Sequence, residues 1–184
     1  ETIILNNFFD AGFRAITIAN LDYKTLNNIK RNEIFDFEEA IHIYNVENIT
    51  LNIDNNHLHY GMIGMKIDNS INGTNINGTN TIAIDNNVIS KYFSRGIDIS
   101  NHHKIEITNN ELFNNYVGIE LENANYCRIV NNTVTNYGIS LSVGIGLVQS
   151  MGNYLQCNTI DKVEHCLYFK GICPSKLYYN TFGN

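Results

Sequence analysis

Residues 105–123 read IEITNNELFNNYVGIELEN and contain one full unit of a pattern that runs through the whole chain. Apolar and polar residues alternate over residues 105–108 and again over residues 119–122. Such alternation indicates a strand with one buried face. An Asn-Asn turn follows the first strand, and Gly118 precedes the second, where the missing side chain permits unusual backbone angles. The stretch therefore predicts short strands joined by tight turns.

The Asn-containing turn recurs eight times, and in each copy a large apolar residue follows the last Asn by two positions. The steps between successive copies are 25, 24, 31, 23, 22, 26 and 22 residues. A fixed offset at a nearly constant period is the signature of a repeat architecture. The eight residues, called the anchor asparagines below, are Asn7, Asn32, Asn56, Asn87, Asn110, Asn132, Asn158 and Asn180.

Each repeat of 22 to 26 residues contains two or three short strands and no helical periodicity. We therefore predict an all-β parallel β-helix of about seven to eight coils, in which each strand pairs with its equivalent one coil along, about 4.8 Å away. Ile, Val, Leu and Phe then fill a dry interior. The anchor asparagines are expected to form an asparagine ladder inside the coils, because amides in register can bond one another and the turn backbone.

The repeat predicts one domain over residues 1–184, interrupted by polar loop insertions near residues 70–80 and 135–143. The repeat already includes Ile3 and still includes Phe182, and no amphipathic capping helix flanks it. An uncapped stack exposes strand edges and core. We therefore expect a fragment of a longer chain, whose neighbouring coils or domains cover both ends.

The formal net charge is −6, and the twelve Lys and Arg residues are scattered along the chain. This argues against a nucleic-acid partner, which requires clustered cations. No stretch is apolar enough to predict a membrane span. Cys127, Cys157, Cys166 and Cys173 lack the spacing of a metal or redox site; they allow three disulfide pairings or remain reduced.

Outward residues at one strand position should form a column that runs along the stack. The second residue after each small residue that begins a strand gives a first column, and the fourth gives a second. The first column is Thr17, His42, Lys66, Asp98, Glu120, Gly146 and Tyr168. The second is Ala19, Tyr44, Asp68, Ser100, Glu122, Val148 and Lys170.

These columns hold the candidate site. Carboxylates on neighbouring rungs could raise each other's pKa for acid/base work, or hold Ca²⁺ against an acidic sugar. The candidate catalytic residues are Lys66, Asp98 and Glu120. The candidate substrate-binding residues are His42, Tyr44, Asp68 and Glu122. The alternative is a solvated face with mixed charges, on which Lys66 and Asp98 form a weak cross-strand pair.

Two further groups of side chains give weaker indications of a functional site. His102 and His103 lie in a turn, where histidines are usually solvated, and no third ligand accompanies them, so no metal site is predicted. Aromatic residues at turn or outward positions could stack on sugars or simply pack. They are Tyr44, Tyr60, Tyr92, Phe93, Tyr116, Tyr137 and Tyr168.

The Asn-Asn-x-apolar turn and the Gly-Ile-x-Ile strand, repeated from Ile3 to Phe182, resemble the right-handed parallel β-helix of the pectin-lyase-like superfamily. That superfamily includes polysaccharide lyases, glycoside hydrolases, epimerases, periplasmic NosD-like proteins, phage tailspikes and surface stalks. The late coils, such as Cys157-Asn158-Thr159-Ile160, look like those of large surface β-helix proteins of Bacteroidetes-type bacteria. No Asp-Pro-His epimerase signature or pectate-lyase arginine motif is present, and Pro174 is the only proline.

Two functions follow as expectations. The first is an exported bacterial β-helix domain, located in the periplasm, at the cell surface or outside the cell, that presents a rigid surface for carbohydrate binding or acts as a stalk. The second is a polysaccharide lyase or glycoside hydrolase that acts on an acidic polysaccharide through Lys66, Asp98 and Glu120. Fold likeness alone does not choose between them. No cofactor is predicted, apart from the Ca²⁺ that acidic columns could hold.

Overall fold

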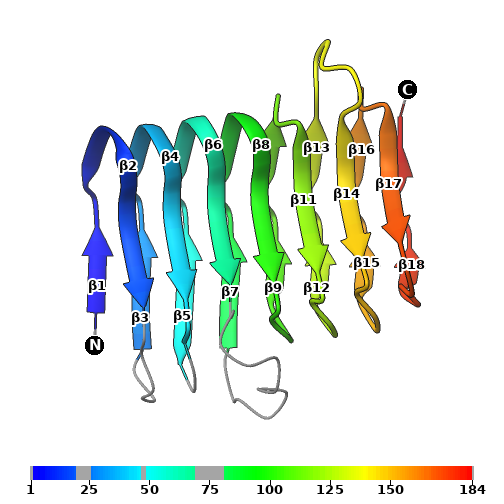
Figure 1. Cartoon of the computed structure of the whole chain (residues 1–184), viewed down its shortest axis with the longest axis horizontal. Coiled ribbons are helices and arrows are strands. Elements are labelled where there is room, and N and C mark those ends of the chain that lie inside the picture. Colours follow the sequence, from blue (N-terminus) through cyan, green and yellow to red (C-terminus); the bar gives the residue numbers. More distant parts are fainter. Residues whose placement is uncertain (1, 20–25, 47–48, 69–80, 184) are drawn as a thin grey trace.

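The computed structural model describes residues 2–19, 26–46, 49–68 and 81–183, and the predicted loop at residues 70–80 lies outside them. These residues form an all-β solenoid of about seven turns, in which strands of successive coils pair in parallel. Figure 1 shows the coils stacked side by side along one axis, from the N-terminal to the C-terminal end. The predicted fold is therefore confirmed.

One strand of each coil belongs to an eight-stranded sheet. Its members, in order, are β1 (Thr2–Leu5), β3 (Leu26–Lys30), β5 (Thr50–Asp54), β7 (Thr81–Asp85), β9 (Glu106–Thr108), β12 (Arg128–Val130), β15 (Tyr154–Gln156) and β18 (Lys176–Tyr178).

The second sheet covers the other two sides of the coils. Its long strands are β2 (Phe8–Ala19), β4 (Glu33–Tyr44), β6 (His57–Asp68) and β8 (Val88–Ser100). Beyond β8 each long strand is replaced by two short ones. The first of each two is β10 (Glu111–Phe113), β13 (Thr133–Thr135), β16 (Thr159–Asp161) or β19 (Thr181–Phe182). The second is β11 (Val117–Glu122), β14 (Val143–Val148) or β17 (His165–Lys170).

Each long strand bends sharply at one residue in the left-handed region. Asp36 has a φ of 57°, Tyr60 and Lys91 each have 61°, and Asn114 occupies the equivalent position at 56° in the coil with short strands. Such angles are uncommon for residues other than glycine and mark a change in chain direction. These bends divide the second sheet into two faces, and they also place the side chains discussed below.

The anchor asparagines form the predicted ladder. The side-chain amide of each donates a hydrogen bond to the next anchor's Oδ1 over 2.9–3.1 Å, from Asn7 through to Asn180. Each backbone N–H bonds the same oxygen. The residue before each anchor has a φ of 52–56°, which turns the chain so that the anchor points inward. The apolar residues two positions later, such as Leu58 and Ile89, pair in register and are fully buried.

Candidate functional site

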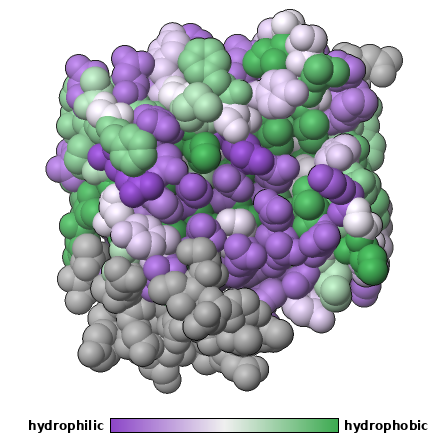
Figure 2. Space-filling view, viewed as in Figure 1, coloured by the Kyte–Doolittle hydropathy of each residue, from purple (hydrophilic) through white to green (hydrophobic). Residues whose placement is uncertain are grey.

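The two outward columns predicted from the sequence exist in the structure. Register pairs His42 with Lys66, Lys66 with Asp98, and Asp98 with Glu120. The second column pairs the neighbouring positions in the same way and contains Tyr44, Asp68, Ser100 and Glu122. Figure 2 shows hydrophilic side chains in a band across the middle of this face. The predicted register is thus confirmed, whereas the catalytic and substrate-binding roles stay predictions.

Seven side chains on this face form what we call the ion cluster. Its members are Arg14, Glu39, His42, Lys66, Arg95, Asp98 and Glu120.

Glu39 is the centre of one half of the ion cluster, and its side chain is only 8% exposed. Its carboxylate accepts hydrogen bonds from Arg14 Nε and from Lys66 Nζ, the latter at 3.1 Å. His42 Nδ1 lies 3.0 Å from the same carboxylate but is not aligned for a hydrogen bond. Burial raises the pKa of Glu39, but these cations outweigh it and the net pKa is lowered. Glu39 is therefore held as a paired anion.

Asp98 and Glu120 lie in the other half, beside Arg95. Arg95 Nε bonds the carboxylate of Glu120 and lies 3.9 Å from a carboxylate oxygen of Asp98. Burial raises the pKa of Asp98, although Arg95 and Lys66 oppose the shift. Within the described residues Lys66 pairs with Glu39 and not, as the sequence suggested, with Asp98.

Sequence reasoning missed three members of the cluster. Arg14, Glu39 and Arg95 occupy one register column, which also contains Ile63. Each immediately precedes the small residue that begins a strand half, a position that could have been read from the repeat. The first predicted column lies three residues further along each strand, at positions such as His42 and Asp98, and so omits the cations that neutralise the carboxylates.

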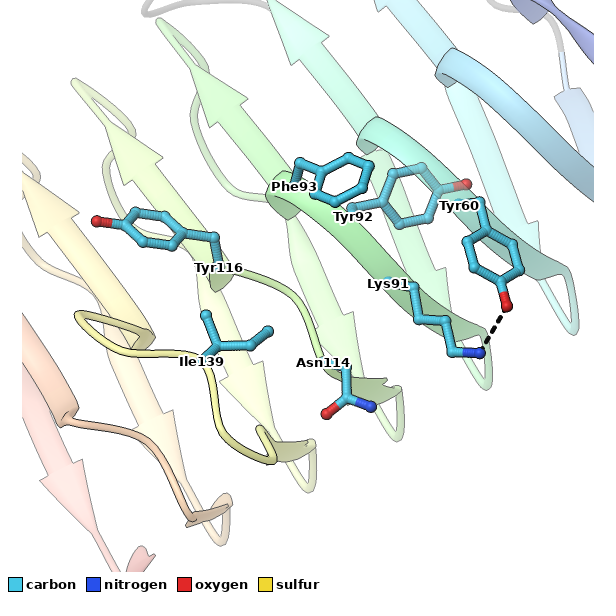
Figure 3. Close-up of a pocket in the computed structure, with 7 residues that line it drawn as sticks. All are labelled: Tyr60, Lys91, Tyr92, Phe93, Asn114, Tyr116 and Ile139. Atoms are coloured by element: carbon cyan, nitrogen blue, oxygen red, sulfur yellow. Dashed lines mark hydrogen bonds between the residues drawn. The ribbon is translucent and has the colours of Figure 1, made fainter.

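A pocket of about 400 Å³ opens at the bend between the two faces, close to the ion cluster along β8. Figure 3 shows its aromatic side chains in a row on neighbouring coils, with Lys91 and Asn114 beside them. Its walls are mainly apolar, and the exposed fractions of Tyr60, Phe93 and Tyr116 are 43%, 77% and 39%. The lining residues are Tyr60, Lys91, Tyr92, Phe93, Asn114, Tyr116 and Ile139.

Polar groups lie at the edge of this aromatic pocket. Lys91 Nζ donates a 2.7 Å hydrogen bond to the hydroxyl of Tyr60 and lies 4.6 Å from the centre of that ring. Asn114 contributes an amide from the next coil. Tyr92 is 1% exposed, and burial raises the pKa of its hydroxyl, so this ring forms the floor and stays protonated. The pocket thus combines exposed ring faces with a cation and an amide.

The burial and the pairing of the histidines differ from what the sequence predicted. His102 is buried, not solvated, and its Nδ1 accepts a 2.9 Å hydrogen bond from the backbone N–H of His103. A different pair is close together: His57 and His59 on β6, whose Nε2 atoms are 2.9 Å apart. The described residues contain no group of three or more His, Cys, Asp or Glu that could hold a metal ion. All four cysteines are free thiols.

Comparison with known proteins identifies a matching family. A family model described as "Periplasmic copper-binding protein (NosD)" matches residues 1–184. No curated protein and no solved structure matches the chain. No helix long and apolar enough to cross a membrane occurs in the described part of the chain.

Proposed function

Because the chain belongs to the NosD family of periplasmic copper-binding proteins, we propose that it is an exported β-helix protein whose aromatic pocket binds carbohydrate. The family supports export to the periplasm, and the parallel stack supplies a rigid surface. The observation that carries the sugar-binding proposal is the presence of three exposed rings, Tyr60, Phe93 and Tyr116, around one pocket on three successive coils.

The spacing and chemistry of the pocket suit a glycan chain. Successive coils repeat at about 4.8 Å, which is close to the length of one sugar ring. The apolar face of a sugar stacks on an aromatic ring, while its hydroxyls need donors and acceptors at the edge. Lys91 and Asn114 supply such groups. Lys91 also offers a positive charge to a sugar carboxylate, which favours acidic glycans over neutral ones.

The ion cluster, unlike the aromatic pocket, offers few unpaired groups to a ligand. Its carboxylates are already paired with Arg14, Lys66 and Arg95, so little charge remains for a ligand. Within the described residues it also lacks a group suited to holding Ca²⁺. We therefore place the glycan in the aromatic pocket and assign the predicted binding residues of the columns no direct contact with it.

Calorimetric titration with acidic and neutral oligosaccharides tests the proposal. Replacing Phe93 by Ala should weaken binding roughly tenfold, since loss of one stacked ring costs about 1 kcal/mol or slightly more. Phe93 is 77% exposed, so the fold should survive. Tyr179→Ala is the matched control, because Tyr179 is 84% exposed and does not line the pocket. Equal affinities of the Phe93→Ala variant and the wild type would rule the site out.

A second candidate, hydrolysis or β-elimination of an acidic polysaccharide, is favoured by one observation. Asp98 has a raised pKa, and Glu120 lies opposite it on the adjacent rung, paired with Arg95. Two carboxylates in such different environments are what acid/base division of labour requires. Release of sugar fragments from an acidic polysaccharide, lost in Asp98→Asn, would support this activity; no release from a broad panel would leave binding alone.

A further inference from the structure

The family description raises the question of where this chain could hold copper. The described residues contain no closed set of three ligands, so a buried, fully protein-coordinated ion does not fit. Copper(II) prefers tetragonal geometry and accepts imidazole ligands, with water in the remaining positions. A pair of converging imidazoles at the surface meets that smaller requirement.

His57 and His59 provide such a pair. They are two residues apart on β6, and residues at this spacing project from the same face of a strand. Both side chains are half-buried. Their ring centres are 4.1 Å apart, the planes are inclined at 64°, and the two Nε2 atoms approach to 2.9 Å.

The separation of the Nε2 atoms matches one coordination geometry better than another. With metal–nitrogen bonds of about 2.0 Å, adjacent corners of a square lie about 2.8 Å apart, whereas two corners of a tetrahedron lie about 3.3 Å apart. The observed 2.9 Å agrees with the square. In the absence of metal, the same distance allows one ring to donate a hydrogen bond to the other.

The surroundings fix the orientation of His59. Its Nδ1 hydrogen-bonds the hydroxyl of Ser90, which is buried on the adjacent coil. The ring of Phe35, on the coil at the other side, stacks on the imidazole at 5.2 Å with the planes 17° apart. When Nδ1 donates this hydrogen bond to the Ser90 hydroxyl, the lone pair lies on Nε2, which faces His57 and is available to a metal.

A carboxylate also lies next to the histidine pair. Glu33 pairs in register with His57, so a carboxylate on the next coil compensates part of the charge of a bound cation.

We propose that His57 and His59 form a surface chelate for one divalent copper ion, oriented by Ser90 and Phe35 and completed by exchangeable ligands. Copper should be preferred to nickel and zinc, following the general order of divalent affinities. Because only two protein ligands are present, the ion stays accessible to a competing ligand. The site therefore suits transient holding of copper better than permanent storage.

The test is a Cu²⁺ titration of the whole chain, followed by calorimetry and by electron paramagnetic resonance. All proteins carry Cys157→Ser, because Cys157 is an exposed thiol that copper(II) would oxidise. We expect one ion per chain and a spectrum showing two equivalent nitrogen ligands.

Three variants decide the assignment. His57→Ala and His59→Gln should each weaken binding at least tenfold and remove one nitrogen from the spectrum. His165→Ala is the matched control, since the His165 side chain is 54% exposed and lies at the far end of the stack. Unchanged affinity in the His57 and His59 variants, or an equal loss in His165→Ala, would overturn the proposal. Glycan binding is measured in parallel. If no glycan binds, the conclusion about copper binding is unaffected.

Discussion

The anchor asparagines and the ion cluster are both stacks of polar side chains in register. The anchor asparagines lie inside the coils, whereas the ion cluster lies on their outer surface. Inside, every coil carries the same residue, and each amide completes the hydrogen bonds of the next. Outside, the residue changes from coil to coil, and opposite charges pair across neighbouring strands. The difference indicates that the interior stack specifies the fold, whereas the exterior stack is free to acquire a function.

The largest effect should come from breaking the ladder. In Asn110→Leu, the backbone N–H and the side-chain amide of Asn87 lose the Asn110 oxygen as an acceptor in a dry interior. The side-chain oxygen of Asn132 and the carbonyl of Ile84 each lose the Asn110 amide as a donor. Unsatisfied buried groups cost about 1 to 3 kcal/mol each, and partial relaxation should leave a loss of about 3 kcal/mol in the free energy of unfolding. Denaturant melts measure this loss directly.

The matched control is Asn52→Leu. Asn52 is half-buried in β5 and makes one side-chain hydrogen bond to Asn28, at 3.3 Å. Its replacement should change stability by no more than about 0.5 kcal/mol. Similar losses in Asn110→Leu and Asn52→Leu would show that the interior ladder has no special role.

An intermediate effect is expected at the centre of the ion cluster. Glu39→Gln leaves Arg14 and Lys66 without their anion, and we expect a loss of about 1 to 2 kcal/mol at pH 7. The folded-state pKa of Glu39 lies below its ordinary value of 4.5. Its stabilisation is therefore present above pH 4.5 and is lost as the pH falls through the folded-state pKa. The difference between variant and wild type should shrink accordingly.

An exposed ion pair supplies the control for this measurement. Arg128 and Glu106 approach to 3.4 Å, but their side chains are 58% and 49% exposed. Glu106→Gln should change stability by less than about 0.5 kcal/mol at any pH, because solvent screens the pair. A loss in Glu39→Gln as small as this one, or one that persists unchanged at pH 3, would contradict the account of Glu39.

The contrast also explains what could be predicted from the sequence. The anchor asparagines and the apolar residues two positions later follow a fixed period, so the fold and the register of Lys66, Asp98 and Glu120 could be predicted. The pairing of Glu39 with Arg14 and Lys66 could not, since register brings side chains together without choosing which rotamers meet.

The aromatic pocket and the histidine pair were harder to predict for a different reason. The pocket depends on the left-handed residues Tyr60, Lys91 and Asn114, whose types do not mark the bend. Ser90, which orients His59, lies 31 residues away, across the enlarged third coil. Because the repeat is longer at that coil, the register that pairs Ser90 with His59 could not be read from a constant period.

The smallest effect should occur at Asp98, in the same cluster as Glu39 but with the opposite sign. Burial raises the pKa of Asp98 in the folded chain, against the attraction of Arg95 and Lys66. A raised pKa means that the contribution to stability is fully present below the unfolded pKa and is lost as the pH rises through the folded pKa. At pH 8 the ionised carboxylate is therefore disfavoured by its surroundings, and Asp98→Asn removes that cost while keeping the shape. We expect the variant to be about 0.5 kcal/mol more stable than the wild type at pH 8 and indistinguishable from it at pH 3, below the ordinary Asp value of 3.8, because the partly exposed side chain limits the effect. Thermal melts at the two pH values measure the difference. A clear destabilisation at pH 8 would instead mean that Arg95 and Lys66 stabilise Asp98 as they and their neighbours stabilise Glu39 and Glu120, and the ion cluster would then act as one uniform network of paired charges.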